Sequence, residues 1–215
     1  MKCIVVFDMD GVIFGHRNFW LELHKAWETL EEGNILTKKY LHSDYGRLVA
    51  EVVNRLWEGK PQESYDELVA VQQYVTGARE AVEGIIKKGY RTAIITSGPY
   101  NLALRAQIEL GVDDIIANRL IFKNGVHVGT TDMTLWPVQN DEKVLPLQEL
   151  CKKHNISANN VTAVIHDTND IRLAEYVKAS GGKVIGFMYE PHTEVEKHCD
   201  VVVREKDLRA ILKYL

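Results

Sequence analysis

Two aspartates near the start of the chain, Asp8 and Asp10, stand two residues apart and are followed by Gly11. In a loop just past a strand end, both carboxylates can turn toward one point, where they repel each other unless a cation lies between them. Mg²⁺ accepts such hard oxygen ligands, and glycine lets backbone N–H groups approach an anion closely. The stretch therefore offers a carboxylate nucleophile, a second carboxylate for proton transfer, a metal site and a nest of backbone amides. The plainer alternative is a solvated turn.

The elements around these aspartates predict an α/β fold. The apolar run 3–7, rich in β-branched residues, predicts a buried strand that ends at Asp8. Strand–loop–helix units then recur and predict a Rossmann-like parallel sheet with helices on both faces. Asn124-Gly125 predicts a hairpin that extends the sheet. Further strands are expected at 92–95, 115–117, 161–165, 183–188 and 201–203, and helices at 78–88, up to 110, at 141–154, up to 179 and up to 214.

Residues 15–75 show helical periodicity and no strand signal. Helices are expected at 18–30, 43–57 and 61–75, with Gly33-Asn34 breaking the first pattern. We therefore predict a helical cap at 15–75, inserted after the first strand. Residues 1–14 and 76–215 then form the α/β core.

Polar clusters follow three of the predicted strands: Asp8 with Asp10, the run 96–98, and the run 166–170. Ligands of parallel sheets bind beyond the carboxyl ends of the strands, so the clusters are expected to converge. In the second cluster, a hydroxyl and helix-start amides can bind phosphate oxygens, although a turn with a helix cap explains the same residues. Lys143 begins a helix, where the helix dipole disfavours a cation. A lysine at such a position suits a role beside several carboxylates and a phosphate.

Composition excludes several classes of protein. The chain has 215 residues, 46% apolar and 26% charged, with a net charge of −4. This balance argues against a nucleic-acid binder, and the apolar runs are too short for a membrane span. The N-terminus does not have the pattern of a secretory signal, and three cysteines without metal-like spacing favour a cytoplasmic protein. Oligomeric state cannot be read from the sequence.

Four segments, in order, resemble the motifs of the haloacid dehalogenase superfamily in its phosphoserine phosphatase-like branch. Phe-Asp-Met-Asp-Gly-Val at 7–12 resembles the first motif. Ser97-Gly98 is similar to the Ser-Gly-Gly form of the second motif, with Pro99 in place of the second glycine. Lys143 fits the third motif, and Asn169-Asp170 fits the end of the fourth. The insertion stands where this family has its C1-type cap.

The start of the fourth motif departs from the family pattern Gly-Asp-Gly-x-Asn-Asp. His166 replaces the glycine, and the two acids are one position closer than expected. An alignment without a gap places His166 at the metal position, whereas one deletion places Asp167 there. We favour Asp167, because Mg²⁺ takes oxygen ligands and avoids imidazole.

The resemblance implies a Mg²⁺-dependent phosphomonoester hydrolase that works through an aspartyl-phosphate. It implies Asp8 as the nucleophile and Asp10 as the acid and base. The implied metal ligands are Asp8, the Asp10 backbone carbonyl and Asp167, with Asp170 as a further candidate. The implied phosphate- and substrate-binding residues are Gly11, Ser97, Gly98, Lys143 and Arg47.

Specificity is expected in the cap. Phosphoserine phosphatases use a cap acid and an arginine for the charges of the amino acid, and Glu22 and Arg47 are candidates for these roles. Trp20 with Trp27 is more typical of a packed core than of a ligand wall. Residues expected to face the site are His16, Arg17, Trp20, Lys25 and Arg47.

The expected substrate is a small phosphorylated metabolite, with a phosphoserine-like compound as one candidate. Two alternatives stay open. A phosphotransferase or phosphomutase of the same fold would show nearly the same residues, and a catalytically weak binding protein would account for the irregular fourth motif.

Overall fold

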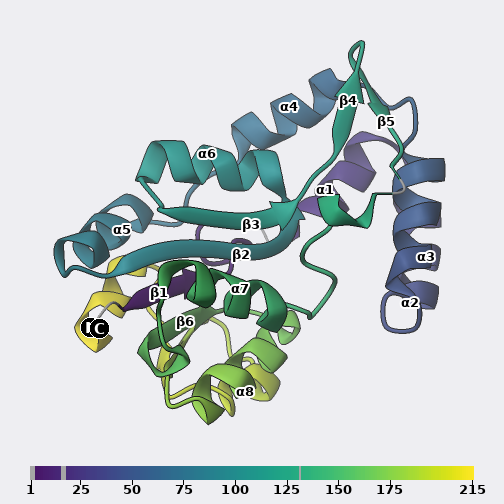
Figure 1. The fold of residues 1–215 in the computed structure, drawn as a ribbon. Coiled ribbons are helices and arrows are strands. Elements are labelled where there is room, and N and C mark those ends of the chain that lie inside the picture. The colour runs from purple at the N-terminus through teal and green to yellow at the C-terminus, as the bar shows by residue number, and fades with distance from the viewer. Residues whose placement is uncertain (1–2, 16–17, 131) are drawn as a thin grey trace.

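A parallel six-stranded sheet forms the centre of the computed structural model, which describes residues 3–15, 18–130 and 132–215. The strand order is β3-β2-β1-β6-β7-β8, and each adjacent pair is parallel (Figure 1). The predicted α/β fold class is therefore confirmed. The strands are β1 (Ile4–Phe7), β2 (Arg91–Pro99), β3 (Asp114–Asn118), β6 (Val161–Ile165), β7 (Lys183–Phe187) and β8 (Val201–Val203).

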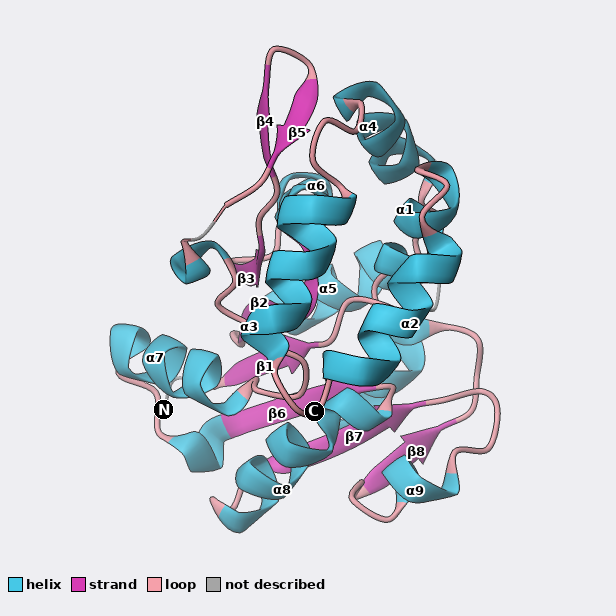
Figure 2. Ribbon diagram, turned by 90° about the vertical axis from the view of Figure 1, so that its right-hand side faces the viewer, coloured by secondary structure: helices cyan, strands magenta, loops and turns pink. Residues whose placement is uncertain are grey.

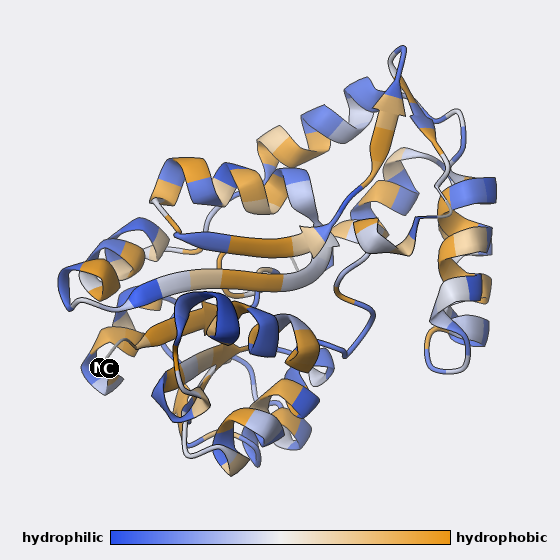
Figure 3. Ribbon diagram, viewed as in Figure 1, coloured by the Kyte–Doolittle hydropathy of each residue, from blue (hydrophilic) through white to orange (hydrophobic). Residues whose placement is uncertain are grey.

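Helices cover both faces of the sheet. All four residues of β1 are buried, and they alternate between two hydrophobic clusters, Val5 and Phe7 in one and Ile4 and Val6 in the other. In Figure 3 the strands are mostly coloured as hydrophobic, whereas the helices carry both kinds of residue. The first cluster includes residues of α5 (Ala78–Lys87), α6 (Tyr100–Leu110) and the 3₁₀ helix η5 (Leu208–Tyr214), and the second residues of α7 (Val144–His154) and α8 (Ile171–Ala179).

Shorter elements connect this framework. No helix in the described residues is long and apolar enough to span a membrane. The connecting helices are η2 (Met133–Leu135), η3 (Ala158–Asn160), η4 (Thr168–Asp170) and α9 (Thr193–Glu196).

In Figure 1 the insertion lies beyond the carboxyl ends of β2 and β3, which the arrowheads mark. It therefore stands over the edge of the sheet where the polar clusters were expected. The π-helix η1 continues directly from α3, and π-helical turns, which are rare, frequently occur at functional sites. The helices of the insertion are α1 (Phe19–Ala26), α2 (Leu30–Tyr40), α3 (Tyr45–Val49), η1 (Ala50–Leu56) and α4 (Gln62–Val71).

The predicted helix break at Gly33-Asn34 is wrong. Helix α2 runs through both residues, and the chain turns instead at Glu28, whose φ is 55°. A Cβ atom at Gly33 would lie 2.2 Å from Cε1 of the buried His24. The glycine therefore permits close packing of α2 on α1, and its local propensity to end a helix is outweighed by that contact.

Strand β2 is longer than predicted and includes residues 96–99, which were expected to form a loop. Its pairing with β3 is irregular between Ile95 and Pro99. Irregular pairing of this kind is common next to active sites, where it can redirect a side chain. Ser97 and Gly98 thus stand on a strand end and not at the start of a helix.

The hairpin of β4 (Ile121–Lys123) and β5 (Val126–Val128) forms a separate two-stranded sheet, so the predicted extension of the main sheet is wrong. Asn124 and Gly125 both have positive φ, 52° and 79°, as the predicted two-residue turn requires. Backbone hydrogen bonds join the hairpin to the insertion: the amide of Gly59 donates to the carbonyl of His127 (2.9 Å), and the amide of His127 to that of Lys60 (2.8 Å). Figure 2 shows the hairpin beside α4.

Candidate active site

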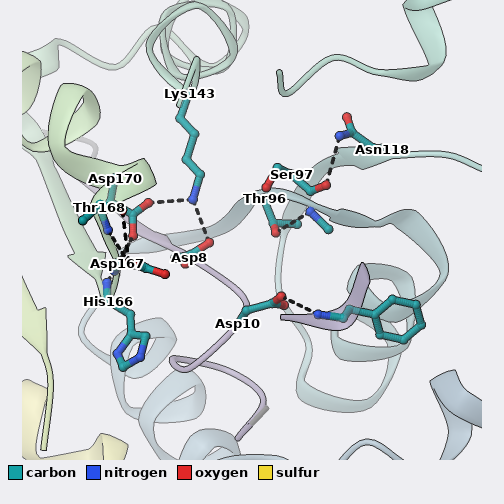
Figure 4. A network of polar contacts seen from close by, with 12 residues as sticks. Asp8, Asp10, Thr96, Ser97, Asn118, Lys143, His166, Asp167, Thr168 and Asp170 are labelled. Carbon is teal, nitrogen blue, oxygen red and sulfur yellow. Dashed lines mark hydrogen bonds and ion pairs between the residues drawn. The ribbon is translucent and has the colours of Figure 1, made fainter. Parts of the chain in front are cut away.

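Three charged side chains from distant parts of the chain, Asp8, Lys143 and Asp170, contact one another (Figure 4). Nζ of Lys143, at the start of α7, lies 2.7 Å from Oδ1 of Asp8 and 2.6 Å from Oδ1 of Asp170. Lys143 and Asp170 are fully buried, and the Asp8 side chain is 5% exposed. Such a group is stable only while every charge keeps its partner, because an unpaired buried charge is costly.

Burial dominates the electrostatics of this group. It raises the pKa of Asp8 to about 7, and the neighbouring Asp170 carboxylate adds to the rise while Lys143 opposes it. Burial alone would lower the pKa of Lys143, but the Asp170 and Asp8 carboxylates outweigh it and raise that pKa above its usual range. Lys143 therefore stays a cation, and the carboxylates around it exceed the positive charge it supplies.

Asp10 links the aspartate loop to the insertion, since its Oδ2 accepts a hydrogen bond from the backbone amide of Phe19 (3.1 Å) at the start of α1. Gly11 has a φ of 78°, and a Cβ there would lie 2.3 Å from Cδ2 of His166. Its amide donates to the carbonyl of Phe14 (2.8 Å) and so bonds within the loop. Gly11 was predicted to bind phosphate, but this hydrogen bond directs its amide into the loop and not toward a ligand.

The end of β2 lies against the aspartate loop. A Cβ at Gly98 would lie 2.5 Å from Cε of Met9, so a larger residue here would require the buried Met9 side chain to shift. Thr96 is buried, and its Oγ1 accepts a hydrogen bond from the Gly98 amide (2.9 Å). Ser97 is partly exposed, which leaves its hydroxyl better placed for a ligand than that of Thr96.

In the fourth motif, the side chains of His166 and Asp167 point in different directions. Nδ1 of His166 donates to the carbonyl of Phe187 (2.9 Å), and Figure 4 shows the imidazole turned away from Asp8. The Asp167 carboxylate extends toward Asp8 in the same view. Asp170 Oδ2 accepts from the amides of His166 (3.1 Å) and Asp167 (3.4 Å), so Asp170 holds the loop and Lys143 in place instead of facing the cavity.

These groups surround a cavity of about 60 Å³. Its carboxylate, hydroxyl and amide oxygens suit a hard cation better than a soft one. In the part of the chain that the structure describes, no three His, Cys, Asp or Glu side chains are placed to hold a metal ion. The predicted ligand set needs only two, Asp8 and Asp167, together with a backbone carbonyl. The lining residues are Asp8, Asp10, Asn18, Trp20, Thr96, Ser97, Gly98, Asp167 and Asn169.

A second cavity of about 560 Å³ opens from the first, between the insertion and the core. Trp20 lines both cavities, as expected of a residue facing the site, whereas Trp27 is 2% exposed and belongs to the core. Glu22 and Lys25 pair with each other on the surface (2.8 Å) and line neither cavity.

Arg47 also lies away from both cavities, because its Nη2 bonds to Oε1 of Glu51 (2.7 Å) on an exposed helix face. Its predicted contact with substrate is not supported by this arrangement. His16 and Arg17, the other two predicted cap residues, lie outside the described residues.

Sequence reasoning missed Asn118, which positions the end of β2. This buried side chain donates to the carbonyls of Ser97 (3.0 Å) and Val138 (2.8 Å) and accepts from the amide of Val138 (3.1 Å). It thereby ties β2 to the segment that leads to Lys143. The signal was present, since Asn118 ends a strand at the same sheet edge as the other polar clusters.

Comparison with known proteins identifies the family. The sequence profile described as haloacid dehalogenase-like hydrolase matches residues 5–175, which include all four motifs. The chain belongs to this family. The resemblance inferred from the motifs is confirmed.

Two curated relatives are phosphoserine phosphatases. A phosphoserine phosphatase of Archaeoglobus fulgidus is 29% identical over 175 residues, which are 81% of this chain and 50% of that protein. A phosphoserine phosphatase of Methanocaldococcus jannaschii is 27% identical over 219 residues, 100% of this chain and 98% of that protein. The chain thus spans half the length of the first relative and nearly all of the second. The predicted enzyme class, a phosphatase, is supported by both.

Solved structures agree on the fold. One described as a phospho-aspartyl intermediate analogue of phosphoserine phosphatase has a TM-score of 0.80 at 24% identity and covers 100% of this chain and 99% of its own. A substrate-bound phosphoserine phosphatase complex also has a TM-score of 0.80, at 23% identity. At these identities the likeness establishes the shared fold.

Proposed function

We propose that this protein is a Mg²⁺-dependent phosphomonoester hydrolase that forms an aspartyl-phosphate on Asp8 and acts on a small phosphorylated metabolite. The observation that carries the proposal is a single small cavity lined by Asp8, Asp10 and Ser97, with Asp8 bonded to the buried Lys143. In this proposal residues 15–75 act as a cap over a core of residues 1–14 and 76–215.

The first step is attack of an Asp8 carboxylate oxygen on phosphorus. Lys143 holds Oδ1, whereas Oδ2 bonds to no other described residue and is the oxygen left to react. The bond between phosphorus and the leaving oxygen breaks as the acyl phosphate forms. Lys143 and the Ser97 hydroxyl stabilise the negative charge on the phosphoryl oxygens, as in-line phosphoryl transfer requires.

Asp10 moves the proton in both halves of the reaction. It gives its proton to the leaving oxygen, which departs as an alcohol. It then takes a proton from water, whose oxygen attacks phosphorus and releases inorganic phosphate and the Asp8 carboxylate. The hydrogen bond from the Phe19 amide holds Asp10 on the cavity side of the loop.

A magnesium ion suits the charge of the cavity. Asp8, Asp10, Asp167 and Asp170 supply four carboxylates against the one cation of Lys143. Burial raises the pKa of Asp8, and the Asp170 and Asp10 carboxylates add to the rise. Asp8, the backbone carbonyl of Asp10 and Asp167 would hold the ion. When bound, it neutralises negative charge on the nucleophile and the phosphoryl group. Asp170 orients Lys143 and is not assigned as a ligand.

Turnover of p-nitrophenyl phosphate by the purified protein, with and without Mg²⁺, tests this proposal. We expect hydrolysis that requires Mg²⁺, and loss of activity in Asp8→Asn with the fold retained. Equal rates in wild type and Asp8→Asn, or rates that chelation leaves unchanged, would overturn it. Adding an alcohol acceptor and measuring phosphate release against ester formation separates hydrolysis from phosphotransfer.

A further inference from the structure

The larger cavity is the space into which the leaving group of the substrate must project. It shares Asn18, Trp20, Ser97, Asp167 and Asn169 with the small cavity that contains Asp8. A phosphoryl group seated at Asp8 therefore has its alcohol portion directed into this space. Its volume of about 560 Å³ falls within the range of roughly 300–1,000 Å³ found for pockets that bind drug-sized ligands.

Three indole rings form one wall of this cavity. Trp20 lies between the other two, with ring centroids 5.6 Å from Trp57 and 5.7 Å from Trp136. Nε1 of Trp20 donates to the carbonyl of Ser97 (2.9 Å), which fixes this ring to the strand end that carries the predicted phosphate ligand. Trp20, which is partly exposed, therefore presents apolar surface at a set distance from the reacting group, and Trp57 and Trp136, which are 2% and 3% exposed, pack against it.

Aliphatic side chains from the insertion complete this surface. They lie on α3 and on the π-helix η1, whose unusual geometry changes which residues share a face. The apolar members from these two helices are Leu48, Val49, Val52 and Val53.

The described residues of the insertion contribute no charged side chain to the lining of the cavity. Among residues 18–75, all of which the structure describes, none that lines the cavity is Asp, Glu, Lys or Arg. The charged lining residues come from the core, and Arg172 is already paired with Glu142 (3.0 Å) and Asp141 (3.6 Å). The ammonium and carboxylate of an amino acid would lose water against this wall without gaining partners there, which is unfavourable.

We propose that the preferred substrate is a phosphomonoester of an uncharged alcohol with an aromatic or similarly bulky apolar body. The inference rests on the proposed phosphatase function and specifies its substrate class. The neutral polar residues of the lining, such as Asn34, Thr37 and His42, leave room for a few hydroxyl or carbonyl groups on that body.

A panel of phosphomonoesters with alkyl leaving groups tests the assignment, because phenols leave more easily and would bias the comparison. With Mg²⁺ present, we expect kcat/KM for 2-phenylethyl phosphate to exceed that for O-phosphoserine at least about tenfold. We also expect 2-phenylethanol to inhibit competitively and serine not to inhibit. A higher or equal kcat/KM for O-phosphoserine would overturn the inference and leave the phosphatase function intact. Absence of turnover for every ester would overturn the phosphatase function itself.

Phosphocholine belongs in the same panel, because aromatic faces also bind quaternary ammonium groups. If it were the best substrate, the assignment of an uncharged body would be wrong.

A matched pair of variants tests the wall directly. Leu48→Asn places an amide in the cavity, and Leu145→Asn makes the same change at a site that is 59% exposed and outside the lining. We expect the ratio of kcat/KM for 2-phenylethyl phosphate over O-phosphoserine to fall about tenfold in Leu48→Asn only. Equal ratios in both variants would overturn the assignment. If Leu48→Asn does not fold, the wild-type panel decides.

Discussion

The two connected cavities differ in nearly every physical respect. The cavity at Asp8 is small, and its polar walls come mainly from loops and strand ends of the core. The cavity under the insertion is about nine times larger, and indoles and aliphatic side chains form much of its wall. We therefore propose that the sheet carries the reaction chemistry and that the insertion selects the leaving group. The core can keep one reaction while the insertion changes the substrate.

The largest expected effect is on catalysis in the small polar cavity that contains Asp8. We expect Asp8→Asn to lower kcat at least about 10³-fold, because the amide cannot form an acyl phosphate. Steady-state kinetics with Mg²⁺ measures the effect, and Asp66→Asn on the exposed surface of α4 is the control. Residual activity near the wild-type level would mean that another residue is the nucleophile.

The next effect is on stability. We expect Lys143→Met to reduce the free energy of unfolding by about 3–5 kcal/mol, because it leaves the buried Asp8 and Asp170 carboxylates without their cation. Urea unfolding measures the loss. Lys87→Met, at a side chain 79% exposed and 3.9 Å from Glu83, should change stability by less than about 0.5 kcal/mol. Similar losses in both variants would contradict the account of the buried group.

Two glycines of the insertion, Gly33 and Gly46, are expected to respond differently to replacement by alanine, because only Gly33 lies where α2 packs on α1. Gly33→Ala should destabilise the protein by about 1–3 kcal/mol, because the new methyl group meets the His24 ring. In Gly46→Ala the nearest atom, Oδ1 of Asp44, would be 3.7 Å away, so this helical position should gain about 0.5–1 kcal/mol. Thermal unfolding of the two variants distinguishes a glycine needed for packing from one that is merely tolerated. A stabilised Gly33→Ala would argue against the close contact of the helices.

The last predicted effect is a pH dependence from His24. Burial lowers the pKa of His24 from 6.5 to about 4, so the unfolded chain binds more protons than the folded one between these values. Stability from this residue is full above pH 6.5 and decreases as the pH falls, by about 2 kcal/mol at pH 5. Urea unfolding at pH 7 and pH 5 should show a smaller loss in His24→Asn than in wild type. Equal losses would mean that His24 accepts a proton in the folded protein.

The sequence predicted the polar cavity far better than the aromatic one. Asp8 and Asp167 each come just after a short buried strand, and Ser97 lies at the end of β2. Parallel strands bring such positions to one edge whatever the rest of the chain does. Trp20, Trp57 and Trp136 have no common spacing, and only the tertiary packing of the insertion on the core brings them together. Gly33 shows the same limit, because its role depends on a contact with His24 in another helix. Arg47 was assigned from its charge, and a local pair with Glu51 accounts for it.

The central claim is that phosphate passes through Asp8. Acid quenching of the enzyme during turnover of 2-phenylethyl phosphate with Mg²⁺, followed by proteolysis and mass spectrometry, tests it directly. We predict the added mass of one phosphoryl group on the peptide that contains Asp8, and its absence in Asp8→Asn. Turnover without this adduct under conditions that preserve acyl phosphates, or a phosphoryl group on a different residue, would contradict the account.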